Sequence, residues 1–291
     1  MLLYSKVLVA TAIVGLFVGS SAQAAITNDL TTIGSSAAIN QVYYQVPATK
    51  VKATGSGLFD SFVRIQGKGT EQGYNTNNKS APFDEKPPFG GFTRDVRLGE
   101  VPIAANPAGL PPGFYFEFAF DGGEGGKSKL LSLDEVQIFT TTVAQQNANT
   151  FTNGILNLVL STLVYRMDAH ANSTIGLNIG NFAGNGQMDM FMYVPLTMFT
   201  SLSPTDPNFL LSIDENLFVV LYSHFGGEGG KYKSSSSFDE WALPRGGDLF
   251  YLPIGAPPTG PPLPEPASIV VWSLLGGVGL LARRNVRKNA L

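Results

Sequence analysis

Cysteine is absent from this 291-residue chain, which excludes disulfide bonds, thiolate metal sites and cysteine nucleophiles. Charged residues make up only 14% of it, whereas about a quarter is usual in soluble domains. Histidine occurs only as His170 and His224, which do not have the spacing of zinc ligands. A folded domain of this composition must therefore be stabilised by a large apolar core.

Glycine, proline and phenylalanine are abundant, with 33, 19 and 20 residues. A composition rich in turn residues and aromatics and poor in charge favours an all-β domain. Apolar residues recur with period two or in short runs bounded by turn residues, as they do in strands. This pattern predicts strands at 39–46, 58–66, 113–120, 130–140, 156–168, 174–179, 188–194 and 217–225. The polar, Gly- and Pro-containing segments 72–92 and 104–112 are predicted to be loops.

Segment 113–120 carries a phenylalanine at every second position: Phe114, Phe116, Phe118 and Phe120. Side chains alternate along a strand, so the four rings lie on one face and need a second sheet to cover them. We therefore expect residues 25–254 to form an antiparallel β-sandwich with a jelly-roll-like topology. An N-terminal signal helix and a C-terminal transmembrane helix are expected to flank it.

Residues 1–24 have the pattern of a secretory signal peptide. Lys6 supplies the positive start, Leu8–Val18 is the apolar run, and Ala22-Gln23-Ala24 has the small residues that signal peptidase requires. Cleavage is expected between Ala24 and Ala25. The alternative is a buried N-terminal helix. The apolar run is too short to span a bilayer.

Three features follow one another at the C-terminus. Residues 255–263 are a Pro- and Gly-rich linker, suited to neither helix nor sheet. Pro264-Glu265-Pro266 comes next, followed by the uncharged segment 267–282. As a helix this segment would be about 24 Å long, shorter than the ~30 Å hydrocarbon core of a bilayer. Arg283 and Arg284 then begin a basic end that the positive-inside rule places in the cytoplasm.

Pro264, Glu265 and Pro266, the uncharged run and the Arg283-Arg284 pair together resemble the PEP-CTERM sorting domain of Gram-negative bacteria, over residues 264–291. The resemblance implies recognition by an exosortase, which is an integral membrane protease or transpeptidase. It also implies export across the inner membrane and delivery to the surface of a cell that makes exopolysaccharide. A plain tail anchor that stays in the membrane needs the same span and charges, so it remains the alternative.

The predicted domain is also similar to a group of PEP-CTERM proteins without an assigned activity. The stretches that carry this similarity are 62–66, 70–76, 131–138, 165–168, 221–226 and 238–241. They imply export and a β-rich domain, but no substrate.

Removal of both ends would leave a strongly acidic protein. Five basic residues lie in the segments expected to leave: Lys6, Arg283, Arg284, Arg287 and Lys288. Of 19 Lys and Arg in the chain, 14 would remain against 22 Asp and Glu, a net charge of about −8. Such a domain would repel phosphates, so no nucleic-acid partner is expected.

One pattern occurs twice in the predicted domain. Residues 122–129 and 226–233 both have the form GGEGGKxK, and Ser-x-Asp-Glu follows at 132–135 and 237–240. Glycine tolerates the positive φ of tight turns. We therefore expect each copy to be a β-hairpin, arising either by duplication or by convergence.

Calcium is the metal that these acidic turns favour, because it binds carboxylate and carbonyl oxygens. The candidate ligands are Asp121, Glu124, Asp134 and Glu135, echoed by Glu228, Asp239 and Glu240. The alternating acids of an EF-hand are absent from the sequence, and a solvated turn neutralised by Lys127 and Lys231 is the alternative. No cofactor is therefore assigned, and calcium stays a hypothesis.

Catalytic patterns are missing from the sequence. The pairs Asp134-Glu135 and Asp239-Glu240 are adjacent, so their carboxylates point to opposite faces of a strand, whereas a glycosidase needs two that face each other. The sequence contains no G-x-S-x-G motif. We therefore expect a protein without enzymatic activity, with an undetected hydrolase as an alternative.

Aromatic rings that could stack on sugars are Trp241, Tyr222, Tyr232, Tyr74 and Tyr115, although core packing is the alternative role for Trp241. The sequence thus predicts an exported, non-catalytic protein of the cell envelope or biofilm matrix. Its expected partners are signal peptidase, an exosortase and the inner membrane. The alternative function is an extracellular module that binds exopolysaccharide.

Overall fold

The structure is a computed structural model that describes residues 26–51, 59–123, 129–182, 187–245 and 251–252. Within these ranges the chain is mostly β-strand, with four short 3-10 helices. The strands are β1 (Asn28–Leu30), β2 (Ser36–Ile39), β3 (Val42–Gln45), β4 (Phe59–Ile65), β5 (Lys68–Gly69), β6 (Glu71–Tyr74), β7 (Val96–Arg97), β8 (Ile103–Ala105), β9 (Phe114–Asp121), β10 (Leu130–Thr141), β11 (Phe151–Thr152), β12 (Ile155–Leu156), β13 (Ser161–Arg166), β14 (Ile175–Asn178), β15 (Met190–Pro195), β16 (Phe218–Phe225), β17 (Ser234–Ser235) and β18 (Asp239–Pro244). The 3-10 helices are η1 (Leu98–Glu100), η2 (Leu196–Met198), η3 (Leu210–Ser212) and η4 (Gly230–Tyr232). The all-β prediction is confirmed for the described residues.

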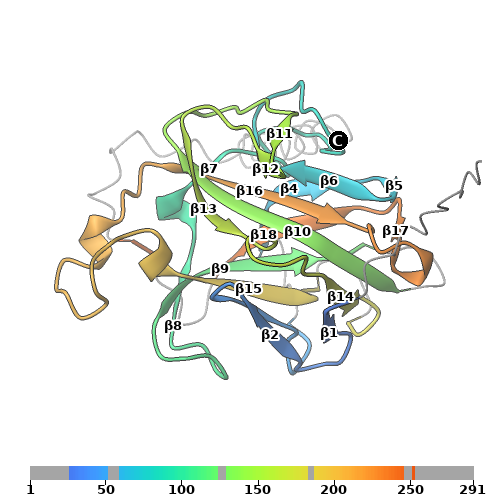
Figure 1. Cartoon of the computed structure of the whole chain (residues 1–291), viewed down its shortest axis with the longest axis horizontal. Helices are drawn as coiled ribbons and strands as arrows, with labels where there is room; N and C mark the ends of the chain where they lie inside the picture. The colour runs from blue at the N-terminus through green and yellow to red at the C-terminus, as the bar shows by residue number, and fades with distance from the viewer. Residues whose placement is uncertain (1–25, 52–58, 124–128, 183–186, 246–250, 253–291) are drawn as a thin grey trace, which may run out of the picture.

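Most strands belong to two seven-stranded sheets (Figure 1). Sheet A has the order β1-β14-β10-β16-β6, with β13 also paired to β10 and β7 to β16. Sheet B has the order β2-β3-β15-β9-β18-β4, with β8 also paired to β9. β1 and β14 run parallel, whereas the other pairs in these two sheets are antiparallel.

Nine strands of the two sheets pair in a nested order along the chain. β4 pairs with β18, β6 with β16, β9 with β15, and β10 with both β13 and β14. The first strand of this set therefore pairs with the last, the second with the last but one, and so on inwards. The pairs β9–β18 and β10–β16 then join these strands into the two sheets.

Aromatic side chains fill the space between the sheets. Phe116, Phe118 and Phe120 of β9 are fully buried, and each buried ring contributes about 1.5–3 kcal/mol through its burial. Phe120 stacks on Phe225 of sheet A with ring centroids 4.8 Å apart. At Phe120 the alternating series thus meets a second sheet, as its spacing predicts, whereas Phe118 contacts Phe62 of its own sheet.

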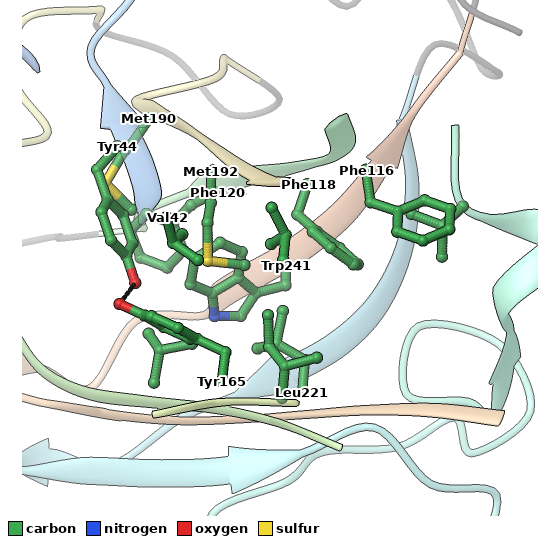
Figure 2. Close-up of a cluster of buried hydrophobic side chains, with 14 of the residues drawn as sticks. Val42, Tyr44, Phe116, Phe118, Phe120, Tyr165, Met190, Met192, Leu221 and Trp241 are labelled. Carbon is green, nitrogen blue, oxygen red and sulfur yellow. Dashed lines mark hydrogen bonds between the residues drawn. The ribbon is translucent and has the colours of Figure 1, made fainter. Parts of the chain in front are cut away.

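Polar bonds inside this core also join the two sheets. The indole Nε1 of Trp241 in sheet B donates to Ser223 Oγ in sheet A over 3.1 Å. The hydroxyls of Tyr44 in sheet B and Tyr165 in sheet A point toward one another and lie 3.0 Å apart (Figure 2). These bonds satisfy polar atoms that would otherwise be buried without a partner.

Six predicted strands are confirmed by β4, β9, β10, β14, β15 and β16, and two are wrong in detail. Segment 39–46 contains the end of β2, a tight turn and β3, because Asn40 and Gln41 have φ of 49° and 72°, as a two-residue hairpin turn requires. Segment 156–168 divides into β12 and β13, with Leu160 at φ 46° between them. The predicted loops 72–92 and 104–112 begin within β6 and β8.

The signal helix expected within residues 1–24, the linker 255–263 and the membrane helix expected within 264–291 lie outside the described residues. In the part of the chain that the structure describes, no helix is long and apolar enough to cross a membrane.

Candidate functional site

The two GGEGGKxK segments lie at the same end of the two-sheet fold. β9 ends at Asp121, opposite Glu240 of β18, and β16 ends with Phe225 opposite Leu133 of β10. The chain passes from β9 in sheet B to β10 in sheet A, and from β16 in sheet A through η4 and β17 to β18 in sheet B. Each segment is thus a crossover between sheets, and the hairpin prediction is wrong because a hairpin joins neighbours in one sheet. We call this region the glycine-rich end; it comprises Gly122, Gly123, Gly226, Gly227 and the side chains bonded to them.

Two aspartates of the repeated Ser-x-Asp-Glu pattern accept backbone bonds at the glycine-rich end. Gly227 N–H donates to Asp134 Oδ2 over 2.6 Å, and Gly123 N–H donates to Asp239 Oδ1 over 2.7 Å. Glycine is required at Gly123, since a Cβ there would lie 2.0 Å from the carbonyl oxygen of Phe238. The aspartates therefore secure the chain where it leaves each sheet.

The glutamates that follow these aspartates point to other partners. Glu135 Oε2 lies 3.1 Å from Nε of Arg166 on β13, and Glu240 forms an ion pair with Arg64 on β4. As the strand pattern predicts, the adjacent carboxylates of each pair do not face one another. A register shift between Leu133 and Glu135 accommodates Asp134 in the ladder.

Burial dominates the electrostatics of this region. It raises the pKa of Asp134, against the opposing effect of the Gly227 N–H bond. It also raises the pKa of Glu135, and the nearby charge of Asp168 adds to that shift. The ring Nδ1 of His224 lies 3.7 Å from Asp134 Oδ2, too far for a direct hydrogen bond.

Asp189 is a member of this region that the sequence analysis missed. It is 4% exposed, and its Oδ2 accepts a 2.8 Å bond from Gly122 N–H. Its Oδ1 has no hydrogen-bond partner among the residues that the structure describes. Burial raises its pKa to about 8, and the charge of Asp121 contributes in the same direction. The signal in the sequence is an acid between Met188 and Met190, inside an otherwise apolar predicted strand.

The candidate calcium ligands are not brought together in the described ranges. Asp134 is bonded to Gly227 and Glu135 to Arg166, while Asp121 lies at the end of β9 and Glu124 lies outside the described residues. Among the side chains that the structure describes, no three His, Asp or Glu are grouped so that they could hold a metal ion. Calcium therefore stays a hypothesis.

Four of the five rings proposed to stack on sugars are buried: Trp241, Tyr74, Tyr115 and Tyr222. Their predicted binding role is wrong because they pack inside the protein, and core packing is confirmed for Trp241. Tyr232 is half-buried, with Nζ of Lys231 5.2 Å from its ring centroid.

Two other rings are exposed beside a charged pair. Phe92 and Phe238 are 42% and 45% exposed, and their ring centroids lie 3.5 and 4.8 Å from the guanidinium carbon of Arg64. Arg64 also pairs with Glu240. Sequence reasoning missed both rings because Phe92 falls in a predicted loop and Phe238 inside the repeated pattern.

The sorting residues Pro264, Glu265, Pro266, Arg283 and Arg284, and the cleavage residues Ala24 and Ala25, lie outside the described residues. Comparison of the chain with family models, curated proteins and solved structures finds no match.

Proposed function

We propose that this chain is an exported, non-catalytic protein of the cell envelope or biofilm matrix, sorted by an exosortase through residues 264–291. One observation carries the proposal: Pro264-Glu265-Pro266, an uncharged apolar run and Arg283-Arg284 follow one another in that order. The N-terminal pattern before Ala25 supports export by the same route. The tail would hold the protein in the inner membrane, either transiently or permanently, before it reaches the surface.

The geometry of the glycine-rich end supports a structural role for the domain. Asp134 and Asp239 accept bonds from backbone N–H groups, and Glu135 and Glu240 pair with arginines. These four carboxylates, the most distinctive acids of the sequence, therefore stabilise the fold itself.

We further propose that the domain is a jelly roll. The nested pairing of β4 with β18, β6 with β16, β9 with β15 and β10 with β13 and β14 supports this topology, since a jelly roll distributes eight strands over two packed sheets.

Fractionation of the native host tests the sorting proposal. In cells that lack the exosortase, the protein is expected to stay in the inner-membrane fraction with its tail intact. Replacing Pro264, Glu265 and Pro266 by alanine should have the same effect in normal cells, whereas Thr259→Ala in the linker should not. Surface delivery that is unaffected by both changes would contradict the proposal and favour an unrelated route.

Exopolysaccharide binding is the second candidate function. The observation that favours it is the pair of exposed rings, Phe92 and Phe238, whose centroids lie 3.5 and 4.8 Å from the guanidinium carbon of Arg64. Rings supply apolar faces for sugar C–H groups, and charged groups can bond hydroxyls.

A glycan array probed with residues 25–262 tests this second candidate. Binding should fall at least tenfold in a Phe92→Ala and Phe238→Ala double variant. It should be unchanged in Leu211→Ala, which alters another exposed apolar side chain. If no polysaccharide on the array binds, the second candidate is wrong.

A further inference from the structure

In the residues that the structure describes, the two copies of the repeated pattern have corresponding strand pairings. One copy runs from β9 through 122–129, of which 124–128 lie outside the described residues, to β10. The other runs from β16 through 226–233 and β17 to β18. β9 lies antiparallel beside β18, and β10 lies antiparallel beside β16. β9 of the first copy thus corresponds to β16 of the second, and β10 to β18. Corresponding strands belong to opposite sheets.

Equivalent residues of the two copies make equivalent contacts. Asp134 of the first copy accepts from the second glycine of the other copy, Gly227, and Asp239 of the second copy accepts from Gly123 of the first. The equivalence extends to the next residue. Glu135 pairs with an arginine on β13 and Glu240 with one on β4, each on the far side of its own strand.

From these reciprocal contacts we infer that the two crossovers form a closed latch, in which each copy holds the other at the glycine-rich end. The circuit follows the chain from Gly123 to Asp134, the bond from Asp134 to Gly227, the chain from Gly227 to Asp239, and the bond back to Gly123. It includes strands of both sheets. Each bond joins neighbouring strands of one sheet, and the chain itself links the two sheets at the crossovers.

A closed circuit makes the two bonds interdependent. While both are present, each crossover is held at both of its ends, so forming either bond requires little further ordering. When one bond is lost, the other must restrain a freer chain and contributes less to stability. Removing both aspartates should therefore destabilise the protein less than the sum of the two single changes.

Thermal unfolding of the mature chain, measured for Asp134→Ala, Asp239→Ala and the double variant, tests the latch. Each single change should lower Tm by about 3–8 °C, since each removes a short hydrogen bond from a backbone N–H to an aspartate side chain. The double variant should show a decrease clearly smaller than the sum of the two. Asp95→Ala is the matched control, because Asp95 accepts from the N–H groups of Asn77 and Gln145 outside the circuit. Its effect should add to that of Asp134→Ala.

Hydrogen exchange provides a readout in the folded state that does not depend on Tm. Asp134→Ala should speed exchange at Gly227, which loses its acceptor, and also at Gly123 on the other crossover. Asp95→Ala should leave Gly123 unchanged. If the alanine variants fail to fold, asparagine at both positions keeps a carbonyl acceptor, and the same non-additive pattern is expected with smaller shifts. Additive effects on Tm together with unchanged exchange at Gly123 in Asp134→Ala would overturn the inference.

Discussion

Replacing Asp189 with asparagine is expected to stabilise the fold at neutral pH. Burial raises the pKa of this carboxyl from 3.8 to about 8, so at pH 7 the folded protein holds a proton that the unfolded chain has released. The unfolded carboxyl, with its pKa of 3.8, lies about three units below pH 7. At ~1.4 kcal/mol per unit, taking up that proton during folding therefore costs about 4 kcal/mol at pH 7. Asparagine is neutral, and its side-chain carbonyl can still accept the bond from Gly122 N–H.

We expect Asp189→Asn to raise the free energy of unfolding by about 2–4 kcal/mol at pH 7, the lower figure allowing for relaxation around the site. The sign of the pH dependence follows from the raised pKa. Between pH 4 and 8 the folded state binds more protons at Asp189 than the unfolded state does. The wild-type protein therefore loses stability through this group as pH rises, by up to ~1.4 kcal/mol per pH unit.

Urea denaturation at pH 5, 6, 7 and 8 measures both effects. The advantage of the Asp189→Asn variant over wild type should grow steadily with pH. Asp214→Asn removes the same charge from an exposed residue and should show no such growth. A variant that is less stable than wild type at pH 8, or an advantage that does not change with pH, would refute the reasoning and indicate that Asp189 is ionised and paired in the fold.

Two substitutions and the removal of calcium provide further tests, each read out as a change in stability. Trp241→Ala removes a fully buried ring and should lower the free energy of unfolding by about 3–5 kcal/mol in urea titrations; a loss below 1 kcal/mol would contradict the packing described here. Gly123→Ala should lower Tm measurably in calorimetry, because its Cβ would meet the Phe238 carbonyl oxygen at 2.0 Å, and a wild-type Tm would contradict that close contact. Chelation of calcium should leave Tm unchanged, since Asp134 and Glu135 already accept bonds from protein groups; a fall in Tm would instead support the calcium hypothesis.

Much of the sheet structure could be predicted from local patterns. Alternating phenylalanines identify β9 and its buried face, because the period of a strand is visible within a few residues. The hairpin of β2 and β3 was missed because Asn40 and Gln41 are not glycines, although both adopt positive φ. β6 was missed because Glu71–Tyr74 has little apolar character to mark it.

The reciprocal contacts of the glycine-rich end could not be predicted in the same way. Gly227 and Asp134 are 93 residues apart in sequence, and Gly123 and Asp239 are 116 apart. Their meeting depends on the nested pairing of distant strands, and periodicity contains no information on that order. The repeat itself was visible in sequence, but a glycine-rich turn has the same composition whether it joins neighbours in one sheet or crosses between two.

Intact-mass spectrometry of the protein recovered from its native host tests the proposed function most directly. We predict a chain that begins at Ala25 and ends near Pro264, with the basic C-terminal residues removed. A protein that retains Met1 would contradict export through a cleaved signal peptide. One that still ends at Leu291 after reaching the cell surface would contradict sorting by an exosortase.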